Sequence, residues 1–158
     1  SWNLLRQLTR SMDLVLLNDD CAVASDTFER MLTDTAPVVL AWGFSCFRMR
    51  AEVWESVGEF DEAFYPAYYE DTDYRRRLKL AGVEVSEWPK DPQVEVALGR
   101  NRGPSGITHG KHDPDGYQGW RGEKLAWFER TLEANKQRYV RKWGGMPDEE
   151  RFTVPFNG

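Results

Sequence analysis

The sequence predicts an α/β protein, in which short strands alternate with helices along the chain. Three short runs are apolar or alternate between apolar and polar residues, as strands do, at residues 12–17, 83–85 and 94–96. Four further stretches repeat apolar residues at helical spacing, at residues 1–11, 51–57, 70–82 and 125–143. The chain has 158 residues, of which 41% are hydrophobic, enough to pack the core of one domain.

Charge and cysteine content exclude several classes of protein. The formal net charge of −5 argues against a general nucleic-acid binder, which normally presents a basic face. No apolar run is long enough to span a membrane, and no charged start precedes an apolar region as in a signal peptide. Cys21 and Cys46 are too few for a disulfide framework and lack the spacing of zinc ligands. We therefore expect buried thiols in a reducing compartment, and a cytoplasmic location.

The first elements are predicted to be a helix, a strand and a second helix. Apolar residues follow a helical period over residues 1–11. The apolar run 12–17 leads into acidic residues, and such a strand brings its last residues to the sheet edge where α/β proteins bind ligands. Asp26 is placed to cap a helix over residues 27–32, with Glu29 three residues on as in a capping box.

A strand-like segment and a short helix come next. Residues 37–50 are largely apolar but are interrupted by Gly43, which marks a bulge or a close approach of two backbones. The alternation after this glycine predicts that Arg48 and Arg50 lie near solvent. Residues 51–57 place their apolar side chains on one side, as in a short helix.

The most distinctive stretch covers residues 58–82. Acidic and aromatic residues lead into a helical run that Gly82 ends. The pair Glu70–Asp71 lies at the entrance of this helix, where backbone N–H groups point outward and acidic residues are favoured. A purely structural interpretation is that one of these acids caps the helix. The same interpretation adds ion pairs between residues four apart, Asp71 with Arg75 and Asp73 with Arg77.

A loop, a long helix and a tail complete the chain. Residues 100–119 are rich in Gly, Pro, Asp and His and have no periodicity, which is typical of a loop. A stripe of apolar residues then recurs at helical spacing: Leu125, Phe128, Leu132, Tyr139 and Trp143. Two glycines followed by Pro147 end this helix. We expect the tail to lie on the surface, anchored by Phe152 and Phe156.

Four stretches, in this order along the chain, resemble motifs of one enzyme family. They are DLVLLNDD (13–20), WGFSCFRMRAEVWESVG (42–58), VGEFDEAF (57–64) and EDTDYRRRLKLAG (70–82). Together they resemble the large inverting GT-A family of nucleotide-sugar glycosyltransferases, of the family two type. The resemblance implies the GT-A fold, the Rossmann-like α/β fold of nucleotide-diphospho-sugar transferases.

The resemblance covers nearly all of this chain but only the later part of the family domain. Residues 1–158 would form a single GT-A domain portion, with a metal- and acceptor-site core over 1–119 and a C-terminal helix and tail over 120–158. The N-terminal nucleotide-binding strands of the family have no counterpart here. Either the sequence is a fragment of a longer enzyme, or it is a truncated relative that has lost the site for the donor base.

Sugar transfer from a nucleotide diphosphate requires that the charge of the leaving diphosphate be neutralised, which Mg²⁺ or Mn²⁺ does. The resemblance places Asn18, Asp19 and Asp20 at the family's metal-binding Asp-x-Asp, with Asn at the first acid and Asp20 as principal ligand. Alternatively, these residues form a turn that ends the strand. The family often offers a late histidine as a third ligand, and His109 is preferred here over His112. The alternative is that both histidines are solvated loop residues.

The acceptor hydroxyl must lose its proton as it attacks the sugar, and a positioned base contributes about 10²–10⁴-fold in rate. By the resemblance, Asp71 is this base, and Glu70 orients it or binds the acceptor. Desolvation by Tyr68, Tyr69 and Trp42 would raise the pKa of the base toward a useful value.

The resemblance also implies substrate contacts. The acceptor-binding candidates are Trp42, Gly43, Asp61 and Tyr69, and the phosphate-binding candidate is Arg77. Trp42 is equally well explained as a core residue. Residues 75–77 are explained by a solvated face of the helix with one buried member.

We therefore expect a metal-dependent inverting glycosyltransferase of the hexosyltransferase type. Its partners would be a nucleotide-diphosphate sugar donor and a saccharide or other hydroxyl acceptor, with Mn²⁺ or Mg²⁺ as cofactor. The main alternative is a non-catalytic carbohydrate-binding or scaffolding module that retains the acceptor half. A third interpretation is a fragment without activity of its own.

Overall fold

The structure of the chain is a computed structural model, and it describes residues 2–18, 21–23, 26–66, 68–88, 94–96 and 122–158. The chain divides into two compact units. The first unit comprises residues 1–58 and 83–120, and the second comprises residues 59–82 and 121–158. Each unit is described by itself below.

The first unit is built on a mixed four-stranded sheet in the order β1-β4-β3-β5. Its strands are β1 (Leu14–Leu17), β3 (Val38–Phe44), β4 (Cys46–Met49) and β5 (Val85–Glu87). β4 runs antiparallel to both β1 and β3, whereas β5 runs parallel to β3. A separate antiparallel pair joins β2 (Cys21–Val23) to β6 (Val94–Val96). The α/β class and the strands predicted at 12–17, 83–85 and 94–96 are therefore confirmed, within a few residues at their ends.

The segment predicted as one interrupted strand, residues 37–50, is instead a tight hairpin of β3 and β4. Gly43 has a φ of +54°, which L side chains rarely adopt, and the N–H of Ser45 donates to the carbonyl of Trp42 at 3.1 Å. The chain therefore reverses at the glycine rather than bulging there. The hairpin brings Leu40 opposite Phe47 and Val38 opposite Met49.

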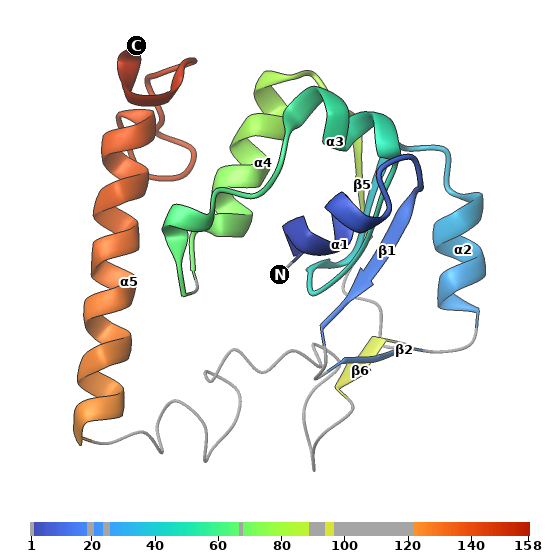
Figure 1. Cartoon of the computed structure of the whole chain (residues 1–158), viewed down its shortest axis with the longest axis horizontal. Coiled ribbons are helices and arrows are strands. Elements are labelled where there is room, and N and C mark those ends of the chain that lie inside the picture. The colour runs from blue at the N-terminus through green and yellow to red at the C-terminus, as the bar shows by residue number, and fades with distance from the viewer. Residues whose placement is uncertain (1, 19–20, 24–25, 67, 89–93, 97–121) are drawn as a thin grey trace. The chain divides into compact units, whose positions relative to one another are not determined.

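Helices cover both faces of this sheet. They are α1 (Trp2–Leu8), α2 (Thr27–Thr33) and α3 (Ala51–Val57), and a helix was predicted at each of these places. Met31 of α2 packs against Cys46 of β4, whereas the ring of Trp2 meets that of Phe47 at 5.2 Å. Since Cys46 and Phe47 are successive residues of one strand, they point to opposite faces, and α1 and α2 lie on opposite sides of the sheet (Figure 1).

Two local predictions for this unit were wrong. Arg48, expected near solvent, is 2% exposed, because its guanidinium donates to the carbonyls of Asp34 and Ala36, in the connection between α2 and β3. Asp26 precedes α2 but makes no side-chain cap, since its backbone is already helical with φ −84° and ψ −12°.

The second unit consists of helices and their connections. They are the short 3₁₀ segment η1 (Glu62–Phe64), α4 (Glu70–Leu80), the long α5 (Gly122–Trp143) and the terminal 3₁₀ segment η3 (Pro155–Asn157). Gly82, with a φ of +66°, ends α4 as predicted. The predicted stripe on α5 is confirmed by the burial of Phe128, Tyr139 and Trp143, and the last two pack with Phe64.

The tail is anchored at one of the two positions predicted. After α5 ends at Trp143, the N–H groups of Arg151 and Phe152 both donate to the carbonyl of that residue. Phe152 lies over Gly144, where an added Cβ would come within 2.8 Å of its ring. Phe156 is 54% exposed, so it does not act as the second anchor.

None of the described helices is both long and apolar enough to cross a membrane. The loop predicted at residues 100–119 lies outside the described residues.

Candidate functional site

The predicted site residues fall into three groups. Asn18, Trp42 and Gly43 belong to the first unit, and Asp61, Tyr69, Glu70, Asp71 and Arg77 belong to the second. The remaining four candidates, the possible metal ligands Asp19, Asp20, His109 and His112, lie outside the described residues. Across the part of the chain that the structure describes, no group of three or more His, Cys, Asp or Glu residues is arranged to hold a metal ion.

Asn18 directly follows β1 and lies beside the β3–β4 turn. Its backbone N–H donates to the carbonyl of Ser45 at 2.9 Å, which extends the pairing of β1 with β4 by one residue. The turn that contains Gly43 therefore lies at the sheet edge where β1 ends. This edge is the location predicted for a ligand site, and it carries one oxygen donor of the proposed metal set, the Asn18 amide.

Trp42 is a core residue of the first unit. It packs in a cluster with Met31, Val39, Ala41 and Cys46, so most of its indole is removed from solvent. Burial raises the pKa of the Cys46 thiol to about 11, which keeps it protonated, as expected for a buried structural cysteine.

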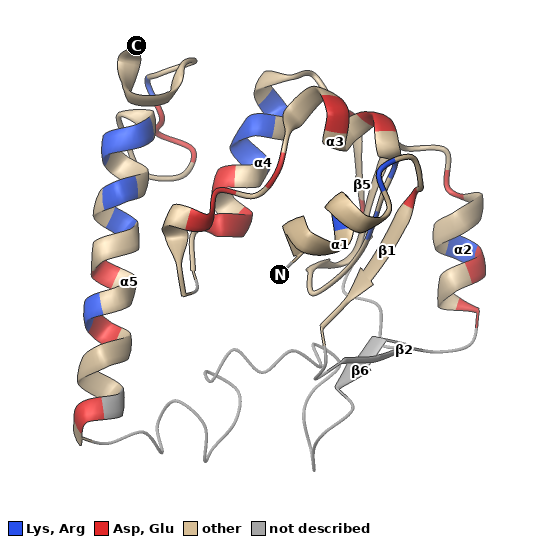
Figure 2. Cartoon of the chain, viewed as in Figure 1, with Lys and Arg blue, Asp and Glu red and all other residues tan. Residues whose placement is uncertain are grey.

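The start of α4 has an unusual backbone. Tyr68 and Tyr69 both have positive φ, +75° and +73°, and the helix begins immediately after them at Glu70. The first helical hydrogen bond runs from the N–H of Asp73 to the carbonyl of Tyr69 at 2.8 Å. Figure 2 shows acidic residues at the start of α4 and basic residues toward its end. In this arrangement the side-chain charges interact favourably with the helix dipole.

Asp71 is held by the next residue in the chain. Its Oδ1 accepts a hydrogen bond from the Thr72 N–H at 2.7 Å and another from the Thr72 hydroxyl at 3.2 Å. The capping position itself is occupied by Tyr69, which makes no side-chain cap. The N–H of Thr72 belongs to the first turn of the helix and has no carbonyl partner there, so the Asp71 side chain supplies its acceptor. The two hydrogen bonds also hold the Asp71 carboxylate in one orientation.

Glu70 has the most perturbed carboxyl group of the candidate site. Burial raises its pKa from 4.5 to about 6, and the neighbouring charge of Asp71 adds to the rise, against hydrogen bonds from the backbone of Glu70 and Tyr68. One of its oxygens, Oε2, is buried and has no hydrogen-bond partner among the described residues. A buried carboxylate with a free lone pair and a pKa near neutrality is suited to accept a proton.

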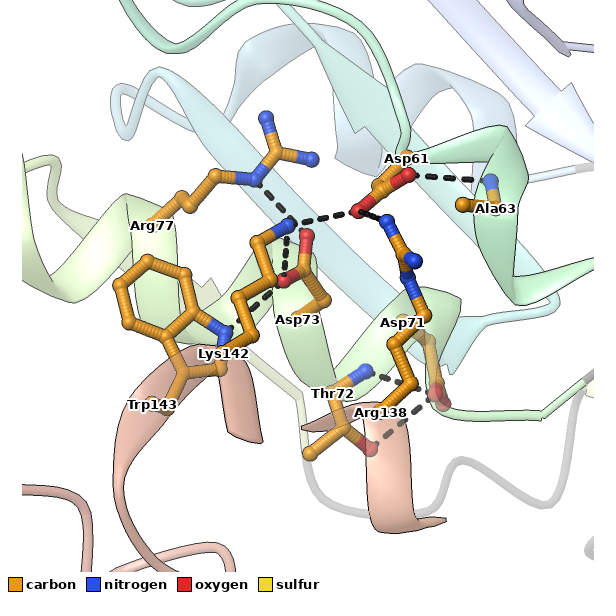
Figure 3. A network of polar contacts seen from close by, with 9 residues as sticks. All are labelled: Asp61, Ala63, Asp71, Thr72, Asp73, Arg77, Arg138, Lys142 and Trp143. Atoms are coloured by element: carbon orange, nitrogen blue, oxygen red, sulfur yellow. Dashed lines mark hydrogen bonds and ion pairs between the residues drawn. The ribbon is translucent and has the colours of Figure 1, made fainter. Parts of the chain in front are cut away.

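Asp61 is bound on both oxygens by the protein. Oδ1 accepts the N–H of Ala63 at 2.9 Å and so caps η1, while Oδ2 lies 2.8 Å from Lys142 Nζ and 3.3 Å from Arg138 Nη2 (Figure 3). Burial opposes its ionisation, but the hydrogen bonds and charges of these donors outweigh burial and lower the pKa of Asp61. The visible role of Asp61 is to tie the segment before α4 to α5.

Asp73 is the centre of the same polar network. It is 0% exposed, and its Oδ1 accepts hydrogen bonds from Lys142 Nζ at 2.7 Å and from the indole N–H of Trp143 at 2.9 Å. Its Oδ2 pairs with Arg77 Nε at 2.9 Å, which confirms the predicted four-residue ion pair (Figure 3). Arg77, the phosphate-binding candidate, also lies over the ring of Tyr74 at 4.6 Å.

The remaining acceptor candidate of this unit, Tyr69, packs inward. Its ring lies 5.5 Å from that of Tyr139, against the cluster that includes Phe64 and Trp143. Together with Asp61, it belongs to a segment that α5 contacts at several points.

The polar contacts that α5 makes with the segment before α4 and with α4 itself were not predicted from the sequence. Lys142 and Asn135 reach residues 81 and 71 positions away in the sequence, and such long-range pairs have no local signal. A weaker signal was present: both polar residues fall on the apolar stripe of α5, at three- and four-residue spacing from Tyr139. A polar residue in such a stripe must find a buried partner.

Comparison of the chain with protein-family models, with curated protein sequences and with solved structures finds no match. The glycosyltransferase interpretation therefore rests on the ordered sequence motifs and on the chemistry of the described residues. Of these, the pair at the start of α4 combines one carboxylate held rigidly with one whose pKa is raised.

Proposed function

We propose that this chain is part of a metal-dependent inverting glycosyltransferase in which Glu70 and Asp71 supply the base that activates the acceptor hydroxyl. The observation that carries the proposal is the environment of this pair. Glu70 is desolvated with a pKa of about 6, and Asp71 is oriented by two hydrogen bonds at a helix start. Both features are typical of carboxylates that take part in proton transfer.

The proposed reaction is a single displacement. The acceptor oxygen forms a bond to the anomeric carbon of the donor sugar as its proton passes to the carboxylate of Asp71. The bond between the anomeric carbon and the diphosphate oxygen breaks, and the nucleotide diphosphate leaves with both bonding electrons. The configuration at the anomeric carbon is therefore inverted.

A divalent cation would neutralise the leaving diphosphate. In this proposal, Asp20 is the principal ligand, Asp19 and Asn18 assist it, and His109 or His112 completes the set. These hard oxygen donors with one imidazole suit Mn²⁺ or Mg²⁺. An Asp20→Ala variant is expected to lose Mn²⁺-dependent turnover while it remains folded. Full activity in that variant, or in EDTA, would contradict metal dependence.

Donor turnover is the direct test of the transferase proposal. It should be assayed with Mn²⁺ across a panel of nucleotide sugars, using this chain and a form extended upstream of Ser1. We expect turnover of at least one donor by the extended form and none by this chain, which we also expect to bind UDP only weakly. The rival proposal, a non-catalytic carbohydrate-binding module, predicts saccharide binding by the extended form without donor turnover.

Substitutions of the acidic pair test the assignment of the base. Asp71→Asn preserves size and hydrogen-bond acceptance but cannot take a proton, so activity is expected to fall by about 10²–10⁴-fold with little change in stability. If Asp71 serves only the first turn of α4, the amide should substitute well and activity should stay within a few-fold. Glu70→Gln is the matched control: a dead Gln variant beside a normal Asn variant would reverse the roles within the pair.

The pH dependence of turnover gives an independent prediction. Because Glu70 is protonated below a pKa of about 6, a reaction that needs its charge should lose kcat/KM as the pH falls through that value. In Glu70→Gln this acid limb should disappear or move. A limb at an unchanged pH in that variant would show that another group titrates.

A further inference from the structure

The backbone that leads into Glu70 is held in an unfavourable conformation. Two consecutive tyrosines, Tyr68 and Tyr69, adopt the left-handed region, which is sterically unfavourable for an L residue. Such a conformation persists only where the surroundings determine it. The contacts that hold these tyrosines therefore also fix the backbone position of the next residue, Glu70, and with it the direction of its side chain.

Asn135 of α5 makes the polar contacts. Its side-chain amide donates one hydrogen bond to the carbonyl of Phe64 at 2.8 Å and another to the carbonyl of Tyr68 at 3.2 Å. Asn135 is 5% exposed, so these bonds form away from competing solvent. An NH₂ group carries two hydrogens and can bind both carbonyls at once, whereas a hydroxyl has only one. The amide thus joins the two ends of the segment between Phe64 and Glu70.

Aromatic contacts on the same helix reinforce this clamp. The ring of Tyr68 meets that of Phe128 edge-on at 5.0 Å, and the ring of Tyr69 packs against Tyr139 at 5.5 Å. Phe128 and Tyr139 precede and follow Asn135 by seven and four residues, so all three lie on one face of α5. One face of this helix therefore holds both tyrosines by their rings and one of them by its backbone.

We propose that Asn135 is a positioning residue for the Glu70–Asp71 pair: its amide holds Tyr68 and Tyr69 in the left-handed conformation and so keeps the Glu70 carboxyl in its desolvated place. The inference deepens the proposed function and rests on it for its catalytic meaning. The structural part of the inference, the dependence of the Glu70 environment on Asn135, stands on contacts within the second unit alone.

The test is a carboxyl titration of Glu70 by ¹³C NMR in the whole chain. We expect the pKa to fall from about 6 toward 4.5 in Asn135→Ala, because a released backbone lets Glu70 reach solvent. Among the residues that the structure describes, the charged neighbour that acts on Glu70 is Asp71, and it is unchanged in this variant. Gln137→Ala is the matched control, since Gln137 is an exposed amide of the same helix that bonds Glu133. Its Glu70 pKa should equal that of the wild type.

The outcomes separate a positioning role from a merely structural one. If Asn135 serves only to pack α5, Asn135→Ala should lower the melting temperature but leave the Glu70 pKa of the folded protein at the wild-type value, and the inference would be overturned. If Asn135→Ala does not fold, Asn135→Ser keeps a small polar group at the buried position and must show the same fall in pKa.

The NMR titration requires no turnover, so it is independent of the transferase assay. In a form that does turn over donor, the acid limb of kcat/KM should move to lower pH in Asn135→Ala, in step with the NMR value. Absence of sugar transfer would refute the proposed function and leave the titration result standing. An unchanged titration would refute the positioning role whether or not sugar is transferred.

Discussion

Asp34 shows how much local structure one carboxylate organises. It lies directly after α2, and its Oδ1 accepts the N–H of Ala36 while Oδ2 accepts the Ser86 hydroxyl at 2.8 Å and the Trp88 indole N–H at 3.1 Å. Burial opposes ionisation, but these three donors and the nearby charge of Arg48 outweigh it and lower the pKa of Asp34. One side chain thus links the end of α2 to β5.

At this scale we predict that Asp34→Ala destabilises the chain by about 1–3 kcal/mol, because it removes three hydrogen bonds and leaves the partly buried donors of Ser86 and Trp88 unmatched. Glu29→Ala, an exposed acid on α2, is the control and should change stability by less than about 0.5 kcal/mol. Urea unfolding measures both. Equal effects would show that the Asp34 bonds contribute no more than surface charge does.

The element that organises the second unit is α5. Four turns of this helix present, in order, Phe128, Asn135, Arg138 with Tyr139, and Lys142 to the segment that precedes α4 and to α4 itself. Lys142 is a buried charge at the centre of these contacts: its side chain is 7% exposed and its ammonium group bridges two carboxylates. Removal of one member of such a buried set leaves uncompensated charge in a poorly solvated place.

We therefore predict that Lys142→Met destabilises the chain by about 3–5 kcal/mol, although methionine fits the space of the lysine stem. Lys136→Met is the matched control, because Lys136 is 44% exposed and pairs with Glu133 at 3.8 Å on the surface. Its cost should stay below about 0.5 kcal/mol. Denaturant midpoints of the two variants decide the question, and similar midpoints would mean that the buried network contributes little.

The end of α5 offers a second prediction at the scale of the element. Gly144→Ala must both occupy a φ of +76° and displace the ring of Phe152, whose own backbone is bonded to Trp143. Gly82→Ala at the end of α4 meets only the first penalty, since a Cβ there contacts nothing within 4 Å at a φ of +66°. In thermal unfolding, the free energy of unfolding of Gly144→Ala should be lower than that of Gly82→Ala by at least about 1 kcal/mol. The reverse order would show that Phe152 moves aside freely.

For the molecule as a whole, stability should depend on pH in two opposite ways. Asp34, Asp61 and Glu150 have pKa values below their usual 3.8, 3.8 and 4.5, so the unfolded chain takes up protons first and stability is lost as the pH falls through this range. Glu70 has a raised pKa, so the folded chain binds its proton more tightly and stability decreases as the pH rises from 4.5 to about 6.

Urea midpoints measured from about pH 3 to about pH 8 test both effects. The wild type should gain stability up to a pH of about 4.5, and Glu70 should then oppose further gain up to a pH of about 6. Glu70→Gln should lack this second component and be relatively more stable at neutral pH than at a pH of about 4. If wild type and variant respond identically across the range, Glu70 is not desolvated in the folded chain.

The elements that were predictable from sequence are those with a local signal. The apolar stripe of α5, the stop at Gly82 and the pair Asp73–Arg77 all follow from spacing within one helix. The burial of Arg48 was not predictable, because it depends on carbonyl groups 12 and 14 residues earlier in the chain. Local alternation cannot anticipate a charged side chain that finds backbone acceptors inside the fold.

The candidate site divides in the same way. Glu70 and Asp71 were identified from a motif, and the structure adds what no motif contains: which carboxyl is desolvated and which is bound. The contacts of Lys142 and Asn135 depend on tertiary structure. The sequence indicated them only through the position of these two polar residues in the apolar stripe of α5. The sequence motif thus identified the acidic pair, whereas the contacts from α5 that hold the neighbouring segment could be seen only in the structure.

The fully enclosed Asp73 has a consequence for how this sequence can vary. Its carboxylate is matched to Lys142, Arg77 and Trp143 and is 0% exposed, so loss of the lysine leaves a negative charge that is no longer balanced at that oxygen. Among descendants of this chain, positions 73 and 142 should therefore change together, an uncharged residue at one accompanied by an uncharged residue at the other. A library randomised at both positions and sorted for folded protein would show this correlation directly, whereas single changes at either position would be rare among the survivors.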